Sequence, residues 1–425
     1  MGKYSETALI PGFYRIPATG LKKIMTFFYQ DRQEMARILL NNFTYISCMN
    51  EYLNDIGEKG RQIRLSGRFQ GRFMHSAGER MTVMGKIRAI LIGCGVVGSG
   101  IIMETYRRGV EYQGIFDVRE EIIGKDFGET AGIEKIGCVI SDVKELPEFL
   151  DSHEIDLAFI TSSAPFTTSY NEIKILLSRG VNILTSLADI YAMEYTHPDV
   201  KEELDSLAKA NGATYFASGI QDVFWTALPV ALSGCLLEAE EIRGTNVALI
   251  DEFGPGVADE CYVGWELEKF EEASAAGELP VNDFLIALYE LAMRLGFHVV
   301  SEESRIQPIL AKEDVYYPTI DRHVKKGRLI GNEVVSTVKT EEGTDLVCYF
   351  VSKMSEEGDT DVNKWEIKGK PSINVITDRM QGEITTGSNM INRIPDVINA
   401  PAGVISAGEM VPPSFKHGDL SQYVK

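Results

Sequence analysis

The stretch KIRAILIGCGVVGSG, residues 86–100, decides the fold of this 425-residue chain. Residues 86–92 are an apolar run typical of a strand that is buried on both faces of a parallel sheet. Residues 93–98 then read GxGxxG, and a helical pattern follows to Arg108. Gly93 permits a tight turn, Gly95 lets the backbone approach a pyrophosphate, and Gly98 lets the helix pack on the strand. The sequence therefore predicts a dinucleotide-binding turn, with the helix N-terminus at Val96 and Val97 offering N–H donors to the anion.

An acidic residue stands where such a site holds the adenosine ribose. A second strand, residues 112–116, ends at Asp117, which is 22 residues beyond Gly95. A carboxylate there usually accepts hydrogen bonds from the ribose hydroxyls, which favours NAD. Arg119 lies two residues further on and could neutralise a 2′-phosphate, so NADP stays open as the alternative.

Strands and helices continue to alternate after this point. Further strands are expected at residues 138–141, 155–162, 182–185 and 214–217, and helices at 170–178 and 198–210. The pattern predicts a Rossmann-type, doubly wound parallel sheet of the α/β class. Because the cofactor crosses the carboxyl ends of such strands, Thr161, Ser162 and Ser163 are candidate cofactor contacts. The two serines could equally cap the next helix.

The pattern changes after Gly219. Strands are expected at residues 241–253, 298–301 and 372–378, two more around the turn at 341–343, and a helix at 281–295. These elements predict an α+β substrate domain with a mostly antiparallel sheet. The helix-like segment 385–399 contains Pro395 and is expected to return to the nucleotide-binding domain. The expected domains are 1–83, 84–217, 218–384 and 385–425.

Composition excludes several classes of protein. The 42 Lys and Arg against 62 Asp and Glu leave a net charge of -20, which disfavours a nucleic-acid partner. No uncharged stretch is long enough for a membrane helix, and the first residues lack the apolar core of a secretory signal, so we expect a cytoplasmic protein. The six cysteines and six histidines are dispersed without metal-ligand spacing, and no metal site is expected.

The first 83 residues differ from the rest of the chain, with 12 basic and 7 acidic residues. Residues 60–72 are basic and Gly-rich without apolar periodicity, so this extension is expected to be poorly structured. One hypothesis is that translation begins at Met84, because Gly78-Glu79-Arg80 can be encoded by a purine-rich run that resembles a ribosome-binding site just upstream. The alternative is a real extension in which residues 21–41 form an amphipathic helix.

Four motifs together resemble the 2,4-diaminopentanoate dehydrogenases and the related NAD(P)-dependent amine dehydrogenases, whose fold is similar to that of dihydrodipicolinate reductase. They are GCGVVGSG at 93–100, IGKDFGETAG at 123–132, SGIQDVFW at 218–225 and NRIPDVINAPAG at 392–403. The resemblance covers about residues 84–412. It implies hydride transfer between nicotinamide and a small amine or its ketone, and a homodimer formed through the second-domain sheet. The adjacent histidines of dihydrodipicolinate reductase occur nowhere in this chain, which disfavours that activity.

The family resemblance also implies a carboxylate that handles the amine proton, and here the chain departs from the pattern. Ala188 aligns with the expected Glu, and Asp189 is the nearest substitute. Asp222 and Glu260 are the other candidates for this role. Asp189 could instead be a helix cap, Asp222 could bind backbone between the domains, and Glu260 could be a solvated acid.

Aromatic and amide side chains in the same motifs are candidates for the substrate pocket. They are Gln221, Phe224, Trp225 and Asn392, although aromatic residues that enter a helix also serve as core. Three functions remain open at this point: an amine dehydrogenase, a ketone, hydroxy-acid or imine reductase that needs no ammonia, and a protein that binds NAD(P) without turnover.

Overall fold

The computed structural model describes residues 86–425 other than 163–165, 188–189, 252, 280–283 and 379–380, together with residues 7–8 and 16–17. The chain divides into two compact units, residues 1–81 and 82–425. In the first unit, β1 (Thr7–Ala8) pairs antiparallel with β2 (Ile16–Pro17). The expected helix at 21–41 and the hypothesis about Met84 concern residues outside those described.

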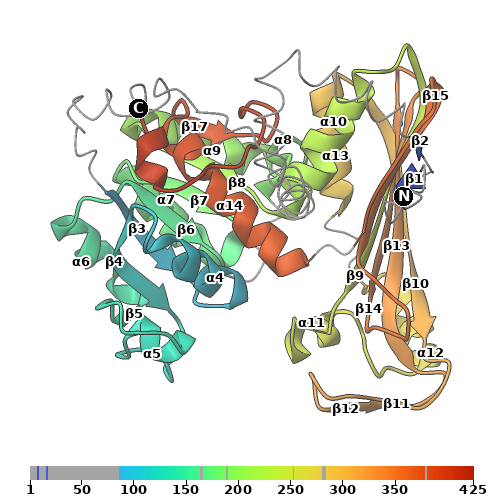
Figure 1. The fold of residues 1–425 in the computed structure, drawn as a ribbon, viewed down its shortest axis with the longest axis horizontal. Coiled ribbons are helices and arrows are strands. Elements are labelled where there is room, and N and C mark those ends of the chain that lie inside the picture. Colours follow the sequence, from blue (N-terminus) through green and yellow to red (C-terminus); the bar gives the residue numbers. More distant parts are fainter. Residues whose placement is uncertain are drawn as a thin grey trace, which may run out of the picture. The chain divides into compact units, whose positions relative to one another are not determined.

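The second unit begins with a seven-stranded parallel sheet in the order β17-β8-β7-β6-β3-β4-β5. The first of these strands along the chain, β3, lies inside the sheet between β6 and β4, so the chain winds outward from it in both directions (Figure 1). This confirms the Rossmann-type α/β fold. The strands are β3 (Ile87–Ile92), β4 (Val110–Asp117), β5 (Ile140–Asp142), β6 (Leu157–Ile160), β7 (Asn182–Thr185), β8 (Thr214–Ala217) and β17 (Gly403–Ile405).

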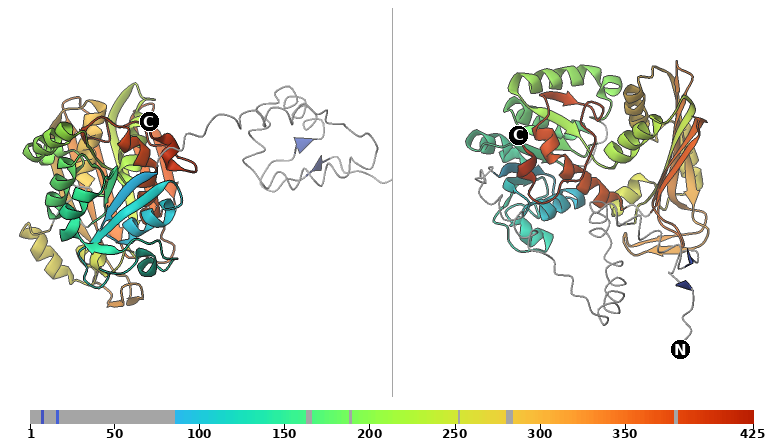
Figure 2. Two further views of the ribbon diagram at one scale, coloured as in Figure 1. Left: turned by 90° about the vertical axis from the view of Figure 1, so that its left-hand side faces the viewer. Right: turned by 45° about the horizontal axis from the view of Figure 1, so that its top comes forward.

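Helices cover both faces of this sheet (Figures 1 and 2). On one face α4 (Val96–Thr105) packs against α14 (Gly382–Ile398), which also contacts β7 and β8. On the other, α7 (Tyr170–Ser178) and α9 (Pro198–Asn211) pack together. Shorter elements complete this part: α5 (Phe127–Ala131), η1 (Val143–Glu145), α6 (Leu146–Ser152), η2 (Phe166–Ser169), α8 (Met193–Thr196) and η5 (Leu420–Tyr423).

The second sheet has six strands in the order β10-β13-β14-β9-β15-β16. Every neighbouring pair is antiparallel except β14 and β9, which run parallel, so the sheet is mostly antiparallel as expected. The strands are β9 (Glu238–Leu249), β10 (Val299–Leu310), β13 (Leu329–Thr340), β14 (Asp345–Lys353), β15 (Val362–Lys370) and β16 (Ile373–Asp378). A small hairpin joins β11 (Val315–Tyr317) to β12 (Arg322–Val324).

Two helical segments pack on one face of the second sheet. They are the π-helix η4 (Gln221–Ala227) and α13 (Phe284–Leu295). Trp225 of η4 meets Trp365 of β15 edge to face, with ring centroids 5.2 Å apart. Both rings lie over Gly244 of β9, where a Cβ atom would stand 2.6 Å from Trp225. The remaining helices are α10 (Leu228–Ser233), α11 (Pro255–Glu260) and α12 (Leu267–Ala275).

The structure also differs from the expected elements in places. The strand expected at 298–301 continues as β10 to Leu310, because it pairs along its length with β13. Its exposed, largely polar side chains are those of an edge strand, where apolar periodicity is weak and Pro308 is tolerated. Strand β15, for which no expectation was made, alternates buried and half-buried residues. No helix in the described part of the chain is long and apolar enough to span a membrane.

Candidate functional site

The three glycines of the turn between β3 and α4 face different surroundings. Gly93 has a φ of +97°, which favours glycine, and a Cβ there would lie 2.9 Å from the backbone nitrogen of Ser162. A Cβ on Gly98 would lie 2.5 Å from Oγ1 of Thr161. At Gly95 a Cβ would meet no atom within 4 Å. The protein itself therefore requires the first and third glycines, whereas the space above Gly95 is open to a ligand.

The N-terminus of α4 opens onto the same space. Its N-cap residue is Gly95, which makes no side-chain capping hydrogen bond, and the first turn carries no acidic residue. The first N–H groups of a helix lack intrahelical partners, and together with the helix dipole they favour an anion. These features fit the pyrophosphate of a dinucleotide, with Val96 and Val97 as backbone donors.

Asp117, at the end of β4, is nearly buried, and four donors reach its carboxylate. They are the backbone N–H of Cys94 at 2.8 Å, the backbone N–H of Arg119 at 2.9 Å, and two guanidinium nitrogens of Arg119, both at 3.0 Å. Burial acts to raise the pKa of Asp117, but the hydrogen bonds from Arg119 and Cys94 outweigh it and lower the pKa to about 2. The carboxylate is therefore ionised, and its side-chain partner Arg119 is 44% exposed.

The loop after β6 contacts the glycine turn. Thr161 donates from Oγ1 to the carbonyl of Gly93 at 2.7 Å, which ties the loop to the turn. Oγ of Ser162 shares a hydrogen bond of 2.8 Å with Oγ of Ser169, the residue that precedes α7. Ser163 lies outside the described residues.

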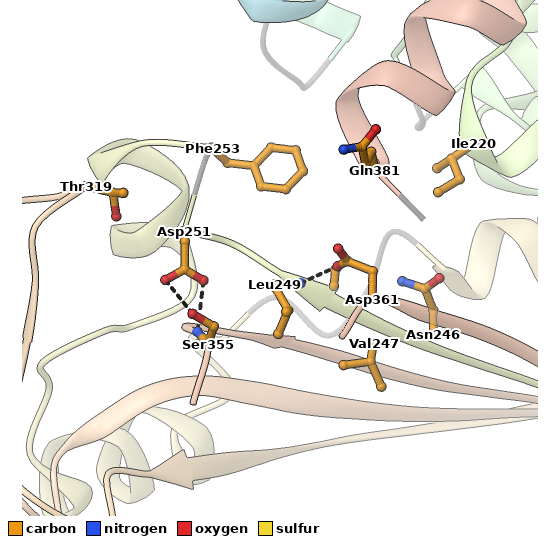
Figure 3. Close-up of a pocket in the computed structure, with 12 residues that line it drawn as sticks. Ile220, Asn246, Val247, Leu249, Asp251, Phe253, Thr319, Ser355, Asp361 and Gln381 are labelled. Atoms are coloured by element: carbon orange, nitrogen blue, oxygen red, sulfur yellow. Dashed lines mark hydrogen bonds between the residues drawn. The ribbon is translucent and has the colours of Figure 1, made fainter. Parts of the chain in front are cut away.

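A pocket of about 370 Å³ lies where the carboxyl end of β9 faces the start of α14 (Figure 3). Ile220, three residues beyond β8, forms part of its wall, so the pocket borders the carboxyl edge of the parallel sheet. A dinucleotide bound at the glycine turn crosses this edge. Besides Ile220, the lining includes the apolar residues Leu249 and Phe253 and the polar residues Asn246, Asp251, Asp361 and Gln381.

Asp222, two residues beyond Ile220, lies in a buried polar cluster. Its carboxylate accepts from Nε of Arg393 at 2.7 Å and Nη2 of Arg393 at 2.8 Å. Ser218 and Asn389 donate to it at 3.1 and 3.2 Å. Asp222 and Arg393 are each 1% exposed, and nearby carboxylates raise the pKa of Arg393 against the effect of its burial. The cluster joins the segment after β8 to α14, and the structure gives Asp222 no contact with the open pocket.

Two other candidate carboxylates have different positions. Glu260 is exposed at the end of α11. Asp189 and Ala188 lie outside the described residues, so the carboxylate implied by the family resemblance stays a prediction. Glu290 of α13, not expected from the sequence, is fully buried and accepts from the backbone N–H of Gly408 at 3.0 Å. Burial raises its pKa to about 7.

The four residues expected to line the substrate pocket are not among the residues that line the pocket beside β9. Trp225 is fully buried in the second core, and the carbonyl of Phe224 accepts from Nε1 of Trp365 at 2.7 Å. Gln221 is half-buried at the start of η4. The side-chain oxygen of Asn392 accepts from the backbone N–H of Lys416 and so holds the C-terminal segment.

Asn246, Asp251 and Asp361 were not identified from the sequence, although Asn246 left a signal. It occupies a position of β9 that shares the buried face with Ile242, where the alternation calls for an apolar residue. Asp251 follows the end of β9, and Asp361 directly precedes β15. Neither position is marked by a local sequence pattern.

Comparisons with known proteins agree with this geometry. Residues 224–425 match the family model of the 2,4-diaminopentanoate dehydrogenase C-terminal domain. The chain is 22% identical to the 2,4-diaminopentanoate dehydrogenase of Acetoanaerobium sticklandii over 352 residues, which are 80% of this chain and 98% of the relative. The structure is similar to that of an amine dehydrogenase from Mycobacterium smegmatis, with a TM-score of 0.73 and 27% identity, over 78% of this chain and 97% of that one.

The likenesses thus extend over both sheets, and the glycine turn, the uncapped helix and the acid at the end of β4 fit a nicotinamide dinucleotide. The chain is similar to the 2,4-diaminopentanoate and amine dehydrogenases, and it is a nicotinamide-dependent oxidoreductase of the amine dehydrogenase type.

Proposed function

We propose that the protein interconverts a small amine with its ketone and ammonia. The overall reaction takes a protonated amine, NAD(P)⁺ and water to ketone, ammonium, NAD(P)H and one proton. The observation that carries this proposal is the pocket beside the carboxyl edge of the parallel sheet, because it joins a space for a small substrate to the edge that a dinucleotide crosses. The similarity to the 2,4-diaminopentanoate dehydrogenases supports the choice of an amine over other substrates.

The chain's own groups would hold the dinucleotide in place. Backbone N–H groups at Val96 and Val97 bind the pyrophosphate above Gly95, and Asp117 with Arg119 holds the adenosine ribose. When bound, the nicotinamide supplies the acceptor for the hydride that leaves the substrate carbon. Thr161, which fixes the loop after β6 to the turn, keeps this edge of the site in position.

For the choice of cofactor, we propose that NAD is preferred and that NADP is also accepted. Asp117 is ionised and placed for ribose hydroxyls, which supports NAD. Two of its four donors are guanidinium nitrogens of the half-exposed Arg119, which has to release the carboxylate before the hydroxyls bind. The released guanidinium is then free to pair with a 2′-phosphate, which supports some use of NADP.

A carboxylate near the reacting carbon has to take the proton from the substrate ammonium. We propose Asp189 for this role, since it is next to the position of the family's Glu. Asp251 and Asp361 line the pocket and are the alternatives among the described residues. Such a group typically contributes a factor on the order of 10² to 10⁴ in rate.

We also propose a homodimer through the face of the second sheet opposite to α13, in the cytoplasm. A groove of about 510 Å³ crosses that face, with Arg243, Arg305 and Tyr349 among its lining residues. The proposed domain boundaries stay at residues 84–217, 218–384 and 385–425. Light scattering after gel filtration measures the number of subunits.

The test of the function is a set of ketones assayed with NADH and with NADPH, each with and without ammonium. We expect consumption of the reduced cofactor to depend on ammonium, and mass spectrometry to detect the amine. Consumption that ignores ammonium and yields an alcohol would replace this proposal with a ketone reductase. Tight cofactor binding without turnover of any ketone or amine would indicate a protein that binds NAD(P) only.

A further inference from the structure

Helix α13 carries a fully buried acid, Glu290, at the point where it meets two segments that adjoin the parallel sheet. The first segment, residues 190–196, follows β7, and the second, residues 406–411, follows β17. Oε1 of Glu290 accepts from the backbone N–H of Gly408 at 3.0 Å, and the N–H of Ala192 is a second donor to its carboxyl. Within the described part of the chain, Oε2 has no hydrogen-bond partner. Glu290 thus touches both segments, and its carboxyl has an oxygen left for a proton.

Other contacts of α13 hold the same two segments. In the first segment, Tyr195 stacks on Tyr289, with ring centroids 4.8 Å apart. Ala192 has a φ of +50°, a left-handed conformation that a residue other than glycine keeps only where its surroundings hold it. In the second segment, the carbonyl of Ala407 accepts from Nη1 of Arg294 at 2.6 Å. The contacts of α13 thus join the second sheet to both segments.

Both segments lead to the site. The first starts close behind the carboxyl end of β7, at the edge that a bound dinucleotide crosses. The second ends at Val411, whose carbonyl accepts from Nη1 of Arg393. The same guanidinium binds Asp222, two residues beyond Ile220 in the pocket wall. A change in how α13 holds these segments therefore reaches the cofactor edge and the pocket.

The surroundings of Glu290 favour its neutral form. Burial raises the pKa of Glu290 to about 7, and the carboxylate of Glu194, which is paired with Lys201, adds to this rise. Tyr191 remains neutral, because its burial raises its pKa well above the usual value. Glu409 of the second segment is exposed and accepts from a backbone N–H. Below about pH 7 the folded protein therefore holds Glu290 as a neutral acid.

Arg294 is the cation that an ionised Glu290 would attract. It lies four residues further along α13, which places both side chains on one face of the helix, and its positive charge already acts on Glu290. Asp222 of η4 is already paired with Arg393. A guanidinium binds a carboxylate more strongly than it binds a neutral carbonyl. Ionisation of Glu290 therefore draws Arg294 away from the carbonyl of Ala407.

We propose that Glu290 is a positioning residue of the site. As a neutral acid it leaves Arg294 on Ala407 and holds both segments against α13, and as a carboxylate it loosens the second segment and lowers turnover. The kinetic part of this inference rests on the proposed amine dehydrogenase activity. If the ionised form is inactive, kcat/KM falls about tenfold between about pH 6 and about pH 8, as does the neutral fraction of a group whose pKa is about 7.

The test compares the wild type with Glu290→Gln, whose amide oxygen can still accept from Gly408 but does not titrate. The ratio of wild-type kcat/KM to that of the variant should fall about tenfold over this pH range, and the ionisation of the substrate amine cancels in the ratio. Hydrogen exchange in residues 190–196 and 406–411 gives a second readout that needs no turnover. At about pH 8 the second segment should exchange faster in the wild type than in the variant, and at about pH 6 the two should agree.

Glu271→Gln changes an exposed acid of α12 and is the matched control, which should follow the wild type in both measurements. Arg294→Met removes the donor to Ala407 at every pH, so its second segment should exchange faster than that of the wild type even at about pH 6. This variant decides the question if Glu290→Gln does not fold. A ratio of kcat/KM that stays constant with pH, or equal exchange of the second segment in all variants, overturns the inference. Turnover of no amine, with the pH-dependent exchange still lost in Glu290→Gln, defeats only the proposed function.

Discussion

The buried pair of Asp222 and Arg393 allows a sharp distinction between a structural and a catalytic carboxylate. The guanidinium of Arg393 is 1% exposed and donates two hydrogen bonds, of 2.7 and 2.8 Å, to the carboxylate of Asp222. In Asp222→Asn this buried cation loses the negative charge of that carboxylate. Breaking one side of a buried ion pair typically costs about 3–5 kcal/mol. The expected result is a drop in the melting temperature of roughly 5–10 °C. In the fraction that stays folded, kcat should remain within about tenfold of the wild-type value, because the carboxylate touches no open space.

Two further variants make this prediction decisive. Asp151→Asn breaks the exposed ion pair of Asp151 with Arg179, at 2.8 Å, and should change stability by about 1 kcal/mol or less. Asp222→Leu combined with Arg393→Met removes both buried charges and should recover part of the stability lost in Asp222→Asn. Calorimetric unfolding and steady-state kinetics measure the two effects separately. An unchanged melting temperature with a hundredfold loss of kcat in Asp222→Asn would falsify the structural assignment and make Asp222 a proton acceptor.

Three other outcomes follow from the site. Gly95→Ala should weaken NADH binding about tenfold or more in a fluorescence titration and leave the melting temperature unchanged, because the added methyl group enters only the space for the ligand. The control Gly100→Ala, equally open but within α4, should change neither the affinity for NADH nor the melting temperature. Arg119→Ala should lower the ratio of kcat/KM for NADP to that for NAD about tenfold, and an unchanged ratio would show that Arg119 does not read the 2′-phosphate. Because the pKa of Glu290 is raised to about 7, the folded protein keeps a proton that the unfolded chain releases, and the free energy of unfolding should fall as pH rises from about 4.3 to 7. Urea unfolding of Glu290→Gln should show a weaker pH dependence over this range, and an unchanged pH dependence would contradict the assignment.

The nucleotide-binding half could be predicted because its signals are local. The strand at 87–92, the glycine turn and Asp117 lie within about thirty residues, and each has one structural reason for its identity. The fold class and the resemblance to these dehydrogenases were confirmed on this basis. The sequence did not show that Arg119 and backbone N–H groups already donate hydrogen bonds to the carboxylate of Asp117.

The substrate side resisted prediction because its residues meet only through long-range packing. Asp222 and Arg393 are 171 positions apart, and Asn246 and Asn363 become neighbours only through the register of β9 with β15. That register depends on pairing along whole strands, which no local pattern encodes. Trp225 was a candidate for the substrate pocket because it is aromatic, but its ring packs against Trp365 in the core on one face of the second sheet.

Two passages of the chain join the parallel sheet to the second sheet, and both border the pocket. The first leaves β8 and contains Ile220, and the second leaves β16 and enters α14 at Gln381 and Gly382. The carboxylate of Asp222 fixes the first passage to α14 through Arg393. Loss of this contact should therefore alter the spacing of the walls before it alters any reacting group. For that reason we expect Asp222→Asn to raise KM for the amine more than it lowers kcat, whereas a substitution at the true proton acceptor should lower kcat first.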